Sequence, residues 1–396
     1  MQRGERWLLP DGVDEVLPPD AQALERLRRR ILDLFESWGY ALVIPPLVEF
    51  IESLQSGNGE DLDLQTFKLT DQVSGRLMGV RADITPQVAR IDAHRLPTEL
   101  PQRLCYLGPI LHTRPDKFAG SRNPLQLGAE LYGYDGIESD AEVVCLMADV
   151  LKLASSEQIT IEIGHMGLFK ALIEDAGLDA DAADKLLDAL LRKDASEMRA
   201  CLDENRVEPL AKKHLSALLE LNGGIDVIER AVVLLADAPA VVGDAIRALS
   251  ALVGLLRSRI PTVGIHVDLA ELRGYRYHTG VIFAAYLPGV GRQVAWGGRY
   301  DNIGRQFGRH RAATGFSTDL KNLVGICLRN QALAQAKTFA PAGSDKGLLD
   351  AITQLREAGG IVVQQLPGQN GDARAMGCTH ELVETGDGWT NKALDD

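Results

Sequence analysis

The sequence is poor in cysteine, and its cysteines are not arranged as a site. Five cysteines are scattered over 396 residues, and no two of them form a Cys-x-x-Cys pair. An odd, scattered set argues against a disulfide framework and against a zinc site built on thiolates. We therefore expect five separate thiols with no special role, in a protein of the reducing cytoplasm.

Long apolar runs and an excess of positive charge are also missing. No run reaches the roughly 20 apolar residues that span a bilayer, and the opening MQRGERWLLPDG lacks the apolar core of a secretory signal. The 42 Lys and Arg are outnumbered by 55 Asp and Glu, which gives a net charge of −13. Such a chain is poorly suited to bind tRNA, because binding to phosphates depends on clustered cations.

The chain does have enough apolar side chain for a large folded core. Hydrophobic residues make up 45% of it, which is in the globular range. Its length corresponds to two or three domains of about 150 residues. The patterns predict a core over residues 1–330, a linker over residues 331–344 and a small C-terminal domain over residues 345–396. Within the core, nearly continuous helical periodicity over about residues 168–260 predicts a helical insertion.

Outside that insertion the core alternates short strands with a few helices. Residues 66–134 are typical of antiparallel strands joined by short turns. Apolar residues at helical spacing predict helices over residues 20–38, from residue 85, over residues 139–154 and over about residues 320–334. Alternation and turn signals predict strands at residues 40–44, 66–71, 76–83, 101–111, 124–135, 160–165, 264–272, 280–288 and 292–298.

Polar residues stand out in two of these segments. In the strand over residues 124–135, Gln126 and Glu130 share one face by alternation. Either that face is wet, or the amide and the carboxyl bind a small polar ligand through directed hydrogen bonds. Asp83 and Thr85 stand where a strand meets a helix. Such a junction can bind a ligand, but the segment taken alone favours a side chain that merely caps the helix.

Two further segments are rich in glycine, arginine and tyrosine. Residues 273–280 (RGYRYHTG) lie between two predicted strands, and Arg273 could bind a carboxylate or phosphate through two parallel hydrogen bonds. A lone histidine such as His278 is more often structural. Residues 295–301 (AWGGRYD) hold paired glycines, which allow the backbone to approach a ligand or another strand closely.

Together these segments resemble the core of histidyl-tRNA synthetase, a class II aminoacyl-tRNA synthetase, over roughly residues 5–330. The matching stretches are LPDGVDEVLP, VIPPLVEF (motif 1), RADITPQVAR, GPILHTRP with GSRNPLQLGAE (motif 2), RGYRYHTG, GGRYD and GFSTDLKNLV (motif 3). The resemblance implies an α+β fold, with an antiparallel sheet flanked by helices, the helical insertion and a small α/β C-terminal piece. It also implies a histidine pocket formed by Asp83, Thr85, Gln126, Glu130, Arg273, Tyr277, His278 and Tyr300.

The ATP half departs from the synthetase pattern. Where motif 2 of that family reads FRHERP, this chain reads LHTRP, so Arg114 or Lys321 could replace the arginine on the α-phosphate only in part. Motif 3 there reads GLER; here Asp319 puts a carboxylate where the base would lie, and Asn322 removes a cation. Adenylate formation needs those charges on the triphosphate. We therefore expect a degenerate ATP site, no catalytic residue and no aminoacylation.

The C-terminal piece departs as well, because some fifty residues stand in place of an anticodon-binding domain of about 100 residues. In this combination the chain is similar to the family of ATP phosphoribosyltransferase regulatory subunits (HisZ). That resemblance implies a non-catalytic subunit, required by a short-form catalytic subunit at the first step of histidine biosynthesis. It further implies a homodimer within a hetero-octamer, L-histidine as feedback effector, and no cofactor or metal. The alternative is a genuine histidyl-tRNA synthetase with a truncated C-terminus.

Overall fold

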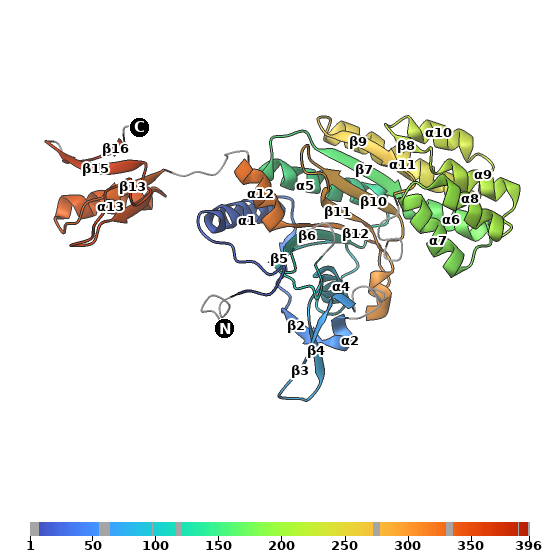
Figure 1. The fold of residues 1–396 in the computed structure, drawn as a ribbon, viewed down its shortest axis with the longest axis horizontal. Helices are drawn as coiled ribbons and strands as arrows, with labels where there is room; N and C mark the ends of the chain where they lie inside the picture. The colour runs from blue at the N-terminus through green and yellow to red at the C-terminus, as the bar shows by residue number, and fades with distance from the viewer. Residues whose placement is uncertain are drawn as a thin grey trace. The chain divides into compact units, whose positions relative to one another are not determined.

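The structure is a computed structural model that describes residues 8–54, 64–96, 98–115, 121–271, 278–329, 336–386 and 388–394. The chain divides into two units, Met1–Arg329 and Asn330–Asp396, and each is described by itself (Figure 1). Within the described residues, no helix is both long and apolar enough to cross a membrane.

The first unit is built on one large sheet, to which the described residues contribute nine strands in the order β1-β5-β6-β12-β11-β10-β7-β9-β8. The pairs β1–β5 and β7–β9 are parallel, and the other neighbours are antiparallel. The predicted α+β class is therefore confirmed. The bounds are β1 Ala41–Leu42, β5 Gln102–Pro109, β6 Leu125–Tyr132, β7 Thr160–His165, β8 Asn222–Gly223, β9 Gly264–Asp268, β10 Val281–Tyr286, β11 Gln293–Arg299 and β12 Ala313–Asp319.

Helices cover both faces of this sheet. Helix α5 (Ile137–Ala154) contacts β6, β10, β11 and β12, and α1 (Asp20–Ser37), α11 (Ala240–Arg259) and α12 (Leu320–Arg329) pack on α5. Helix α4 (Thr85–His94) packs on strand residues of the sheet such as Tyr106 and Tyr132. The buried residues of α1 are spaced four apart, so they lie on one face of the helix; they are Ala23, Leu27, Ile31 and Phe35.

A small antiparallel sheet, in the order β2-β4-β3, lies in the same unit. Its strands are β2 (Val48–Phe50), β3 (Phe67–Thr70) and β4 (Leu77–Val80), with the short helix α2 (Ile51–Leu54) against β2 and β4. Large apolar side chains are exposed on this sheet and on the segment that leads to it from the end of β1: Leu42, Ile44, Leu47, Leu69, Val73 and Leu77.

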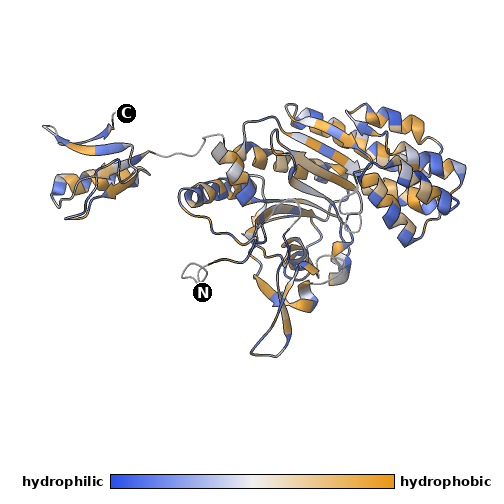
Figure 2. Ribbon diagram, viewed as in Figure 1, coloured by the Kyte–Doolittle hydropathy of each residue, from blue (hydrophilic) through white to orange (hydrophobic). Residues whose placement is uncertain are grey.

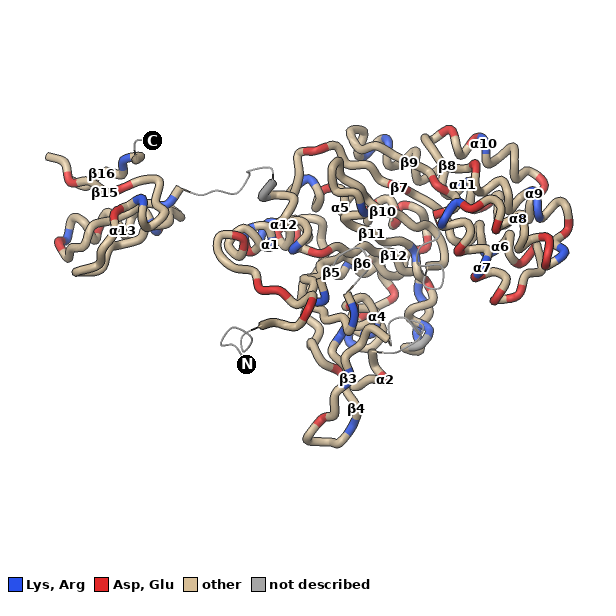
Figure 3. The backbone as a smooth tube through the Cα atoms, viewed as in Figure 1, with Lys and Arg blue, Asp and Glu red and all other residues tan. Residues whose placement is uncertain are grey.

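Residues 166–259, all of them described, form the helical insertion that the sequence predicts over about residues 168–260. Buried residues of α7, for example, are alanines and leucines; Figure 2 shows hydrophobic and hydrophilic residues intermixed along these helices, and Figure 3 shows charges of both signs on them. Asp179 and Asp194 cap the second and third helices by accepting hydrogen bonds from backbone N–H groups. The helices are α6 Met166–Asp175, α7 Ala180–Leu191, α8 Ala195–Glu204, α9 Pro209–Ala217, α10 Val227–Leu234 and α11.

The second unit is a four-stranded sheet in the order β14-β13-β15-β16, with helix α13 (Lys346–Glu357) against it. Its strands are β13 (Lys337–Ala340), β14 (Ile361–Gln364), β15 (His380–Thr385) and β16 (Gly388–Ala393). Strand β13 pairs in parallel with both β14 and β15. The predicted linker over residues 331–344 is therefore wrong for residues 337–340. Pro341 and Gly343, which suggested a linker, only end the strand.

Candidate functional site

A cavity of about 310 Å³ opens on the large sheet, between strands β6, β10, β11 and β12 and the residues that lead into α4. Its volume lies at the small end of ligand pockets. Apolar strand residues form part of its wall, and polar residues come from the start of α4, from the strands and from the ends of the β9–β10 connection. Its polar and ionisable lining residues are Asp83, Thr85, Glu130, Glu271, His278, Gln293, Tyr300 and Ser317.

Glu130 is the most deeply buried carboxyl of this cavity, with 1% of its surface exposed. Tyr106 donates a hydrogen bond of 3.1 Å to Oε1, and Tyr300 donates one to Oε2. Burial raises the pKa of Glu130 to about 8, although these two hydroxyls oppose the rise. The face that carries Glu130 is therefore not wet. Of the two alternatives that alternation left open, a solvated face is excluded.

Room for Glu130 comes from a glycine on the neighbouring strand. Gly315 lies directly opposite Glu130 in the antiparallel pair β6–β12. A Cβ atom at position 315 would fall 1.5 Å from Oε2 of Glu130. Only glycine leaves the carboxyl in its present position, and the sequence analysis did not single this glycine out.

Asp83 and Gln126 form a second polar pair, at the start of α4. Gln126 donates a hydrogen bond of 2.8 Å from Nε2 to Oδ1 of Asp83, and its Oε1 accepts the backbone N–H of Ile84. Asp83 also accepts the N–H of Thr85, and the Thr85 hydroxyl lies 3.0 Å from the Tyr106 hydroxyl. These contacts link Asp83 to Glu130 through the backbone N–H and hydroxyl of Thr85 and the hydroxyl of Tyr106, and both carboxyls line the small cavity.

Six of the eight residues predicted for the pocket gather in this region. Asp83, Thr85, Glu130, His278 and Tyr300 line the cavity, and Gln126 contacts Asp83. Burial lowers the pKa of His278 to about 4, so its ring is neutral near pH 7. The other two predicted residues, Arg273 and Tyr277, lie outside the described residues.

Arg299, in the predicted segment 295–301, fixes the end of β11 rather than lining the cavity. Its guanidinium forms an ion pair of 2.8 Å with the buried Asp140 of α5 and donates to the hydroxyl of Ser139. Its backbone carbonyl accepts the N–H of Thr279 at 2.7 Å. Asp140, which the sequence analysis missed, therefore helps to hold the segment that carries His278. A lone aspartate early in a helix gave no signal of this contact.

The predicted ATP site corresponds to a second, larger cavity of about 1000 Å³, whose lining includes Asp319 and Asn322. Oδ1 of Asp319 accepts the backbone N–H groups of Leu125 and Lys321, both at 3.0 Å. Burial nevertheless raises the pKa of Asp319. The carboxyl of Asp319, where the ATP base was predicted to lie, thus accepts hydrogen bonds from two backbone N–H groups.

The cations around Asp319 are also engaged. Arg292 donates a hydrogen bond of 2.7 Å to Oδ1 of Asn322, and Lys321 forms an ion pair of 3.2 Å with Asp14. Arg114, the third predicted residue, is exposed and does not line this cavity. A triphosphate would have to compete with these protein groups for the positive charges that it needs.

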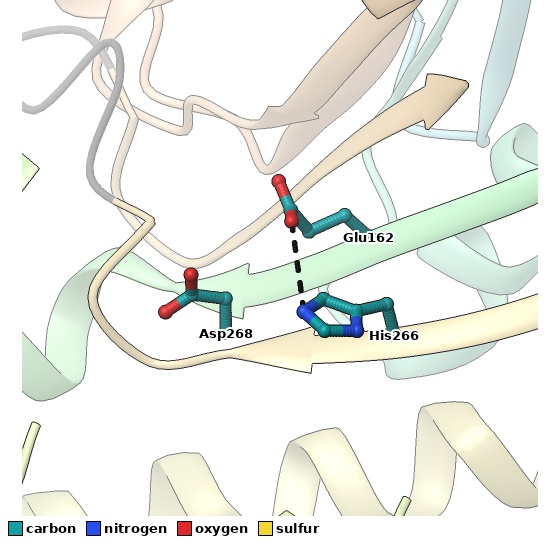
Figure 4. Close-up of side chains that lie close together, drawn as sticks. All are labelled: Glu162, His266 and Asp268. Carbon is teal, nitrogen blue, oxygen red and sulfur yellow. Dashed lines mark ion pairs between the residues drawn. The ribbon is translucent and has the colours of Figure 1, made fainter. Parts of the chain in front are cut away.

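A group that the sequence analysis missed lies on β7 and β9, beside the larger cavity. Glu162, His266 and Asp268 bring one ligand atom each within 4.8 Å of the others (Figure 4). Imidazole with carboxylates suits a divalent transition metal. Lys193, however, already donates to both oxygens of Asp268, at 2.7 and 3.0 Å. The group is therefore an ion-pair network as it stands, and a metal would have to displace an ammonium.

Comparisons with known proteins agree on the kind of fold and on its relatives. Residues 12–323 match the histidyl-tRNA synthetase family, and residues 335–392 match the C-terminal domain of the ATP phosphoribosyltransferase subunit HisZ. The chain is 54% identical to a regulatory subunit of ATP phosphoribosyltransferase from Thioalkalivibrio sulfidiphilus over 383 residues, 97% of each chain. It is 51% identical to the one from Alkalilimnicola ehrlichii, over 99% of this chain and 98% of the other.

A solved structure shows the same likeness. The crystal structure of an ATP phosphoribosyltransferase regulatory subunit/histidyl-tRNA synthetase from Bacillus halodurans superposes with a TM-score of 0.80 at 28% identity. The match covers 95% of this chain and 97% of the other. The fold is therefore shared over nearly the whole length of both chains.

Proposed function

The chain belongs to the family of ATP phosphoribosyltransferase regulatory subunits, and we propose that it binds the short-form catalytic subunit of that enzyme and senses histidine for it. Identity of about half over nearly the full length of both relatives carries the regulatory assignment. The match of residues 335–392 to the C-terminal domain of these subunits supports it independently. The regulatory chain itself does not catalyse the condensation of ATP with phosphoribosyl pyrophosphate; the partner does.

The single observation that carries histidine sensing is the buried carboxyl of Glu130 in a small cavity. Asp83, 2.8 Å from the amide of Gln126, offers acceptors for an α-amino group at one side of the cavity. Glu130 lies among the hydroxyls of Tyr106 and Tyr300 and offers a hydrogen-bond partner for an imidazole. By the resemblance, Arg273 would bind the carboxylate. An amino acid with a polar ring satisfies all these groups together.

The same arrangement argues against the alternative, a genuine histidyl-tRNA synthetase. Asp319 carries negative charge at the predicted base position, and Arg292 and Lys321 are engaged by protein groups. A pocket that holds histidine without activating it can serve as a sensor, because regulation needs differential binding and not turnover.

Titration calorimetry with L-histidine and with Mg-ATP tests the proposal on the full chain, alone and mixed with the catalytic subunit. We expect heat from histidine and none from ATP, and the chain should raise the condensation rate of the catalytic subunit. Histidine-dependent exchange of pyrophosphate into ATP would establish the synthetase alternative instead. If histidine binds neither to the chain nor to the complex, the sensing role is wrong, while the requirement for the regulatory chain can still be measured.

We further propose that the chain pairs with a second copy within a hetero-octamer of four regulatory and four catalytic chains, in the cytoplasm. The exposed apolar residues around the small sheet support pairing, because exposed apolar clusters mark interaction surfaces. Ile44 is 81% exposed and Val73 is 96% exposed. Measuring the mass of the purified chain tests this step separately from histidine binding.

A further inference from the structure

The connection between β9 and β10 starts at a residue that the helical insertion holds. Asp268, the last residue of β9, accepts hydrogen bonds from Lys193 on both carboxylate oxygens, at 2.7 and 3.0 Å. Lys193 lies in the turn between α7 and α8 and has a left-handed backbone, with φ of 54°. The Asp268 carboxyl is 11% exposed and the Lys193 side chain is 41% exposed, so the ion pair is shielded from solvent on the side of the carboxylate.

The other end of the connection is held by the insertion as well. Lys170, in α6, donates a hydrogen bond of 2.7 Å to the backbone carbonyl of His278. Two residues later, the carbonyl of Gly280 accepts the N–H of Met166 at 2.8 Å. Burial lowers the pKa of Lys170, which marks its ammonium as partly withdrawn from water. A charged donor to a carbonyl in such a setting is a strong hydrogen bond.

Both anchored ends lie at a cavity, and Glu271 near the first end and His278 at the second line the proposed histidine pocket. His278 and Glu271 line the small cavity, and Asp268 and Glu271 line the larger one. The backbone of Asp268 is also packed tightly, because a Cβ atom on Gly164 would lie 2.8 Å from its carbonyl oxygen. A shift of these residues on ligand binding therefore has to change their contacts with α6 or with the turn that carries Lys193.

The insertion can transmit such a change because its helices contact one another in series. Helix α6 contacts α9 and α11, α9 contacts α8, and α8 contacts α7. The two lysines thus belong to one set of packed helices. Lys193 binds Asp268 at one end of the connection, and Lys170 binds the carbonyl of His278 at the other end.

We propose that Lys170 and Lys193 are positioning residues that couple histidine binding to the position of the helical insertion. The inference rests on the proposed function, since histidine is the ligand whose binding is coupled. The coupling is reciprocal: histidine restrains the insertion, and the insertion raises the affinity for histidine. The insertion is thereby the element that reports an occupied pocket to the rest of the assembly.

The variants Lys170→Met and Lys193→Met test this in the full chain, with Lys212→Met as a matched control. Lys212 pairs with Asp203 inside the insertion, so its loss should leave histidine binding unchanged. Calorimetry should give a histidine dissociation constant about tenfold weaker for each of the two variants. Lys170→Arg and Lys193→Arg, which retain a cationic donor, should restore most of the affinity.

Hydrogen exchange separates coupling from a merely structural role. Histidine should slow amide hydrogen exchange over residues 180–204 in the wild-type chain. The Lys170→Met/Lys193→Met double variant should lose this response. Circular dichroism should show that the double variant is still folded. If the variants bind histidine as the wild type does, or retain the exchange response, the coupling is wrong. If wild-type chain and complex both fail to bind histidine, the proposed sensing function fails first, and the inference fails with it.

Discussion

Tyr300 donates its phenolic hydroxyl to the carboxyl of Glu130, a residue 170 positions earlier in the chain. The contact joins the GGRYD segment to β6, and it places a hydroxyl against the buried carboxyl of the proposed pocket. Because the pair is buried, the protonation state of Glu130 affects both ligand binding and stability.

The stability of the empty chain should depend on pH through Glu130. Its pKa is about 8 in the folded chain, against an ordinary value of 4.5. Between these values the folded state holds a proton that the unfolded state has lost, so the free energy of unfolding falls as pH rises through this window. Glu130→Gln removes this dependence. The free energy of unfolding of the variant minus that of the wild type should therefore rise by on the order of 2–4 kcal/mol between pH 5 and pH 8.

Urea unfolding at pH 5, 6.5 and 8 measures this difference. Glu204→Gln, at an exposed residue of α8, is the control and should follow the wild-type curve. Parallel curves for Glu130→Gln and wild type would contradict the prediction.

Feedback inhibition should depend on the same carboxyl. Glu130→Ala removes the proposed partner of the imidazole, so histidine should no longer inhibit the assembled enzyme, while assembly with the catalytic subunit stays intact. The measurement is the condensation rate against histidine concentration, with the mass of the complex as the control. Unaltered inhibition in this variant would show that the effector binds elsewhere.

The ion pair between Arg299 and Asp140 should be a large contributor to stability. Arg299→Met leaves a buried carboxylate without its partner, which typically costs about 3–5 kcal/mol. Adding Asp140→Leu removes the unpaired charge and should recover part of the loss. Chemical denaturation of the two single variants and the double variant completes the cycle; strictly additive losses would rule out the coupling.

Pairing of two copies should depend on the exposed apolar residues of the small sheet and of the segment between β1 and β2. Ile44→Asp puts a charge on a residue that is 81% exposed, so it should lower dimer mass without unfolding the chain. Light scattering after gel filtration measures this. Val233→Asp, at a 75% exposed residue of α10, is the control and should leave the mass unchanged.

Local pattern predicted many of the strands, whereas the pocket residues were proposed from the family resemblance and the long-range contacts escaped prediction. Alternation in residues 124–135 put Gln126 and Glu130 on one face, because the period of a strand is strictly two. Alternation could not show that Gly315 opposes Glu130, since register between distant strands is a property of the whole sheet. The contacts of Lys170 and Lys193 with the β9–β10 connection escaped prediction for the same reason.

The C-terminal unit shows a different kind of failure. Proline and glycine near residue 340 resembled a linker, yet Lys337–Ala340 is an inner strand with a parallel neighbour on each side. Four residues are too few for a periodic signal, and their pairing partners come later in the chain. Proline and glycine indicate where a strand can end, but they do not indicate whether a strand precedes them.

The pairing of β6 with β12 also sets the order of events during synthesis. Leu125 and Asp319, which share a hydrogen bond, are 194 residues apart. At ordinary translation rates of 5–20 residues per second, an interval on the order of 10–40 seconds separates the two strands at the ribosome. During that interval one edge of β6 has no neighbour and could pair with another nascent chain. The helical insertion is made in the same interval, so the pocket can close only after the insertion has had time to fold.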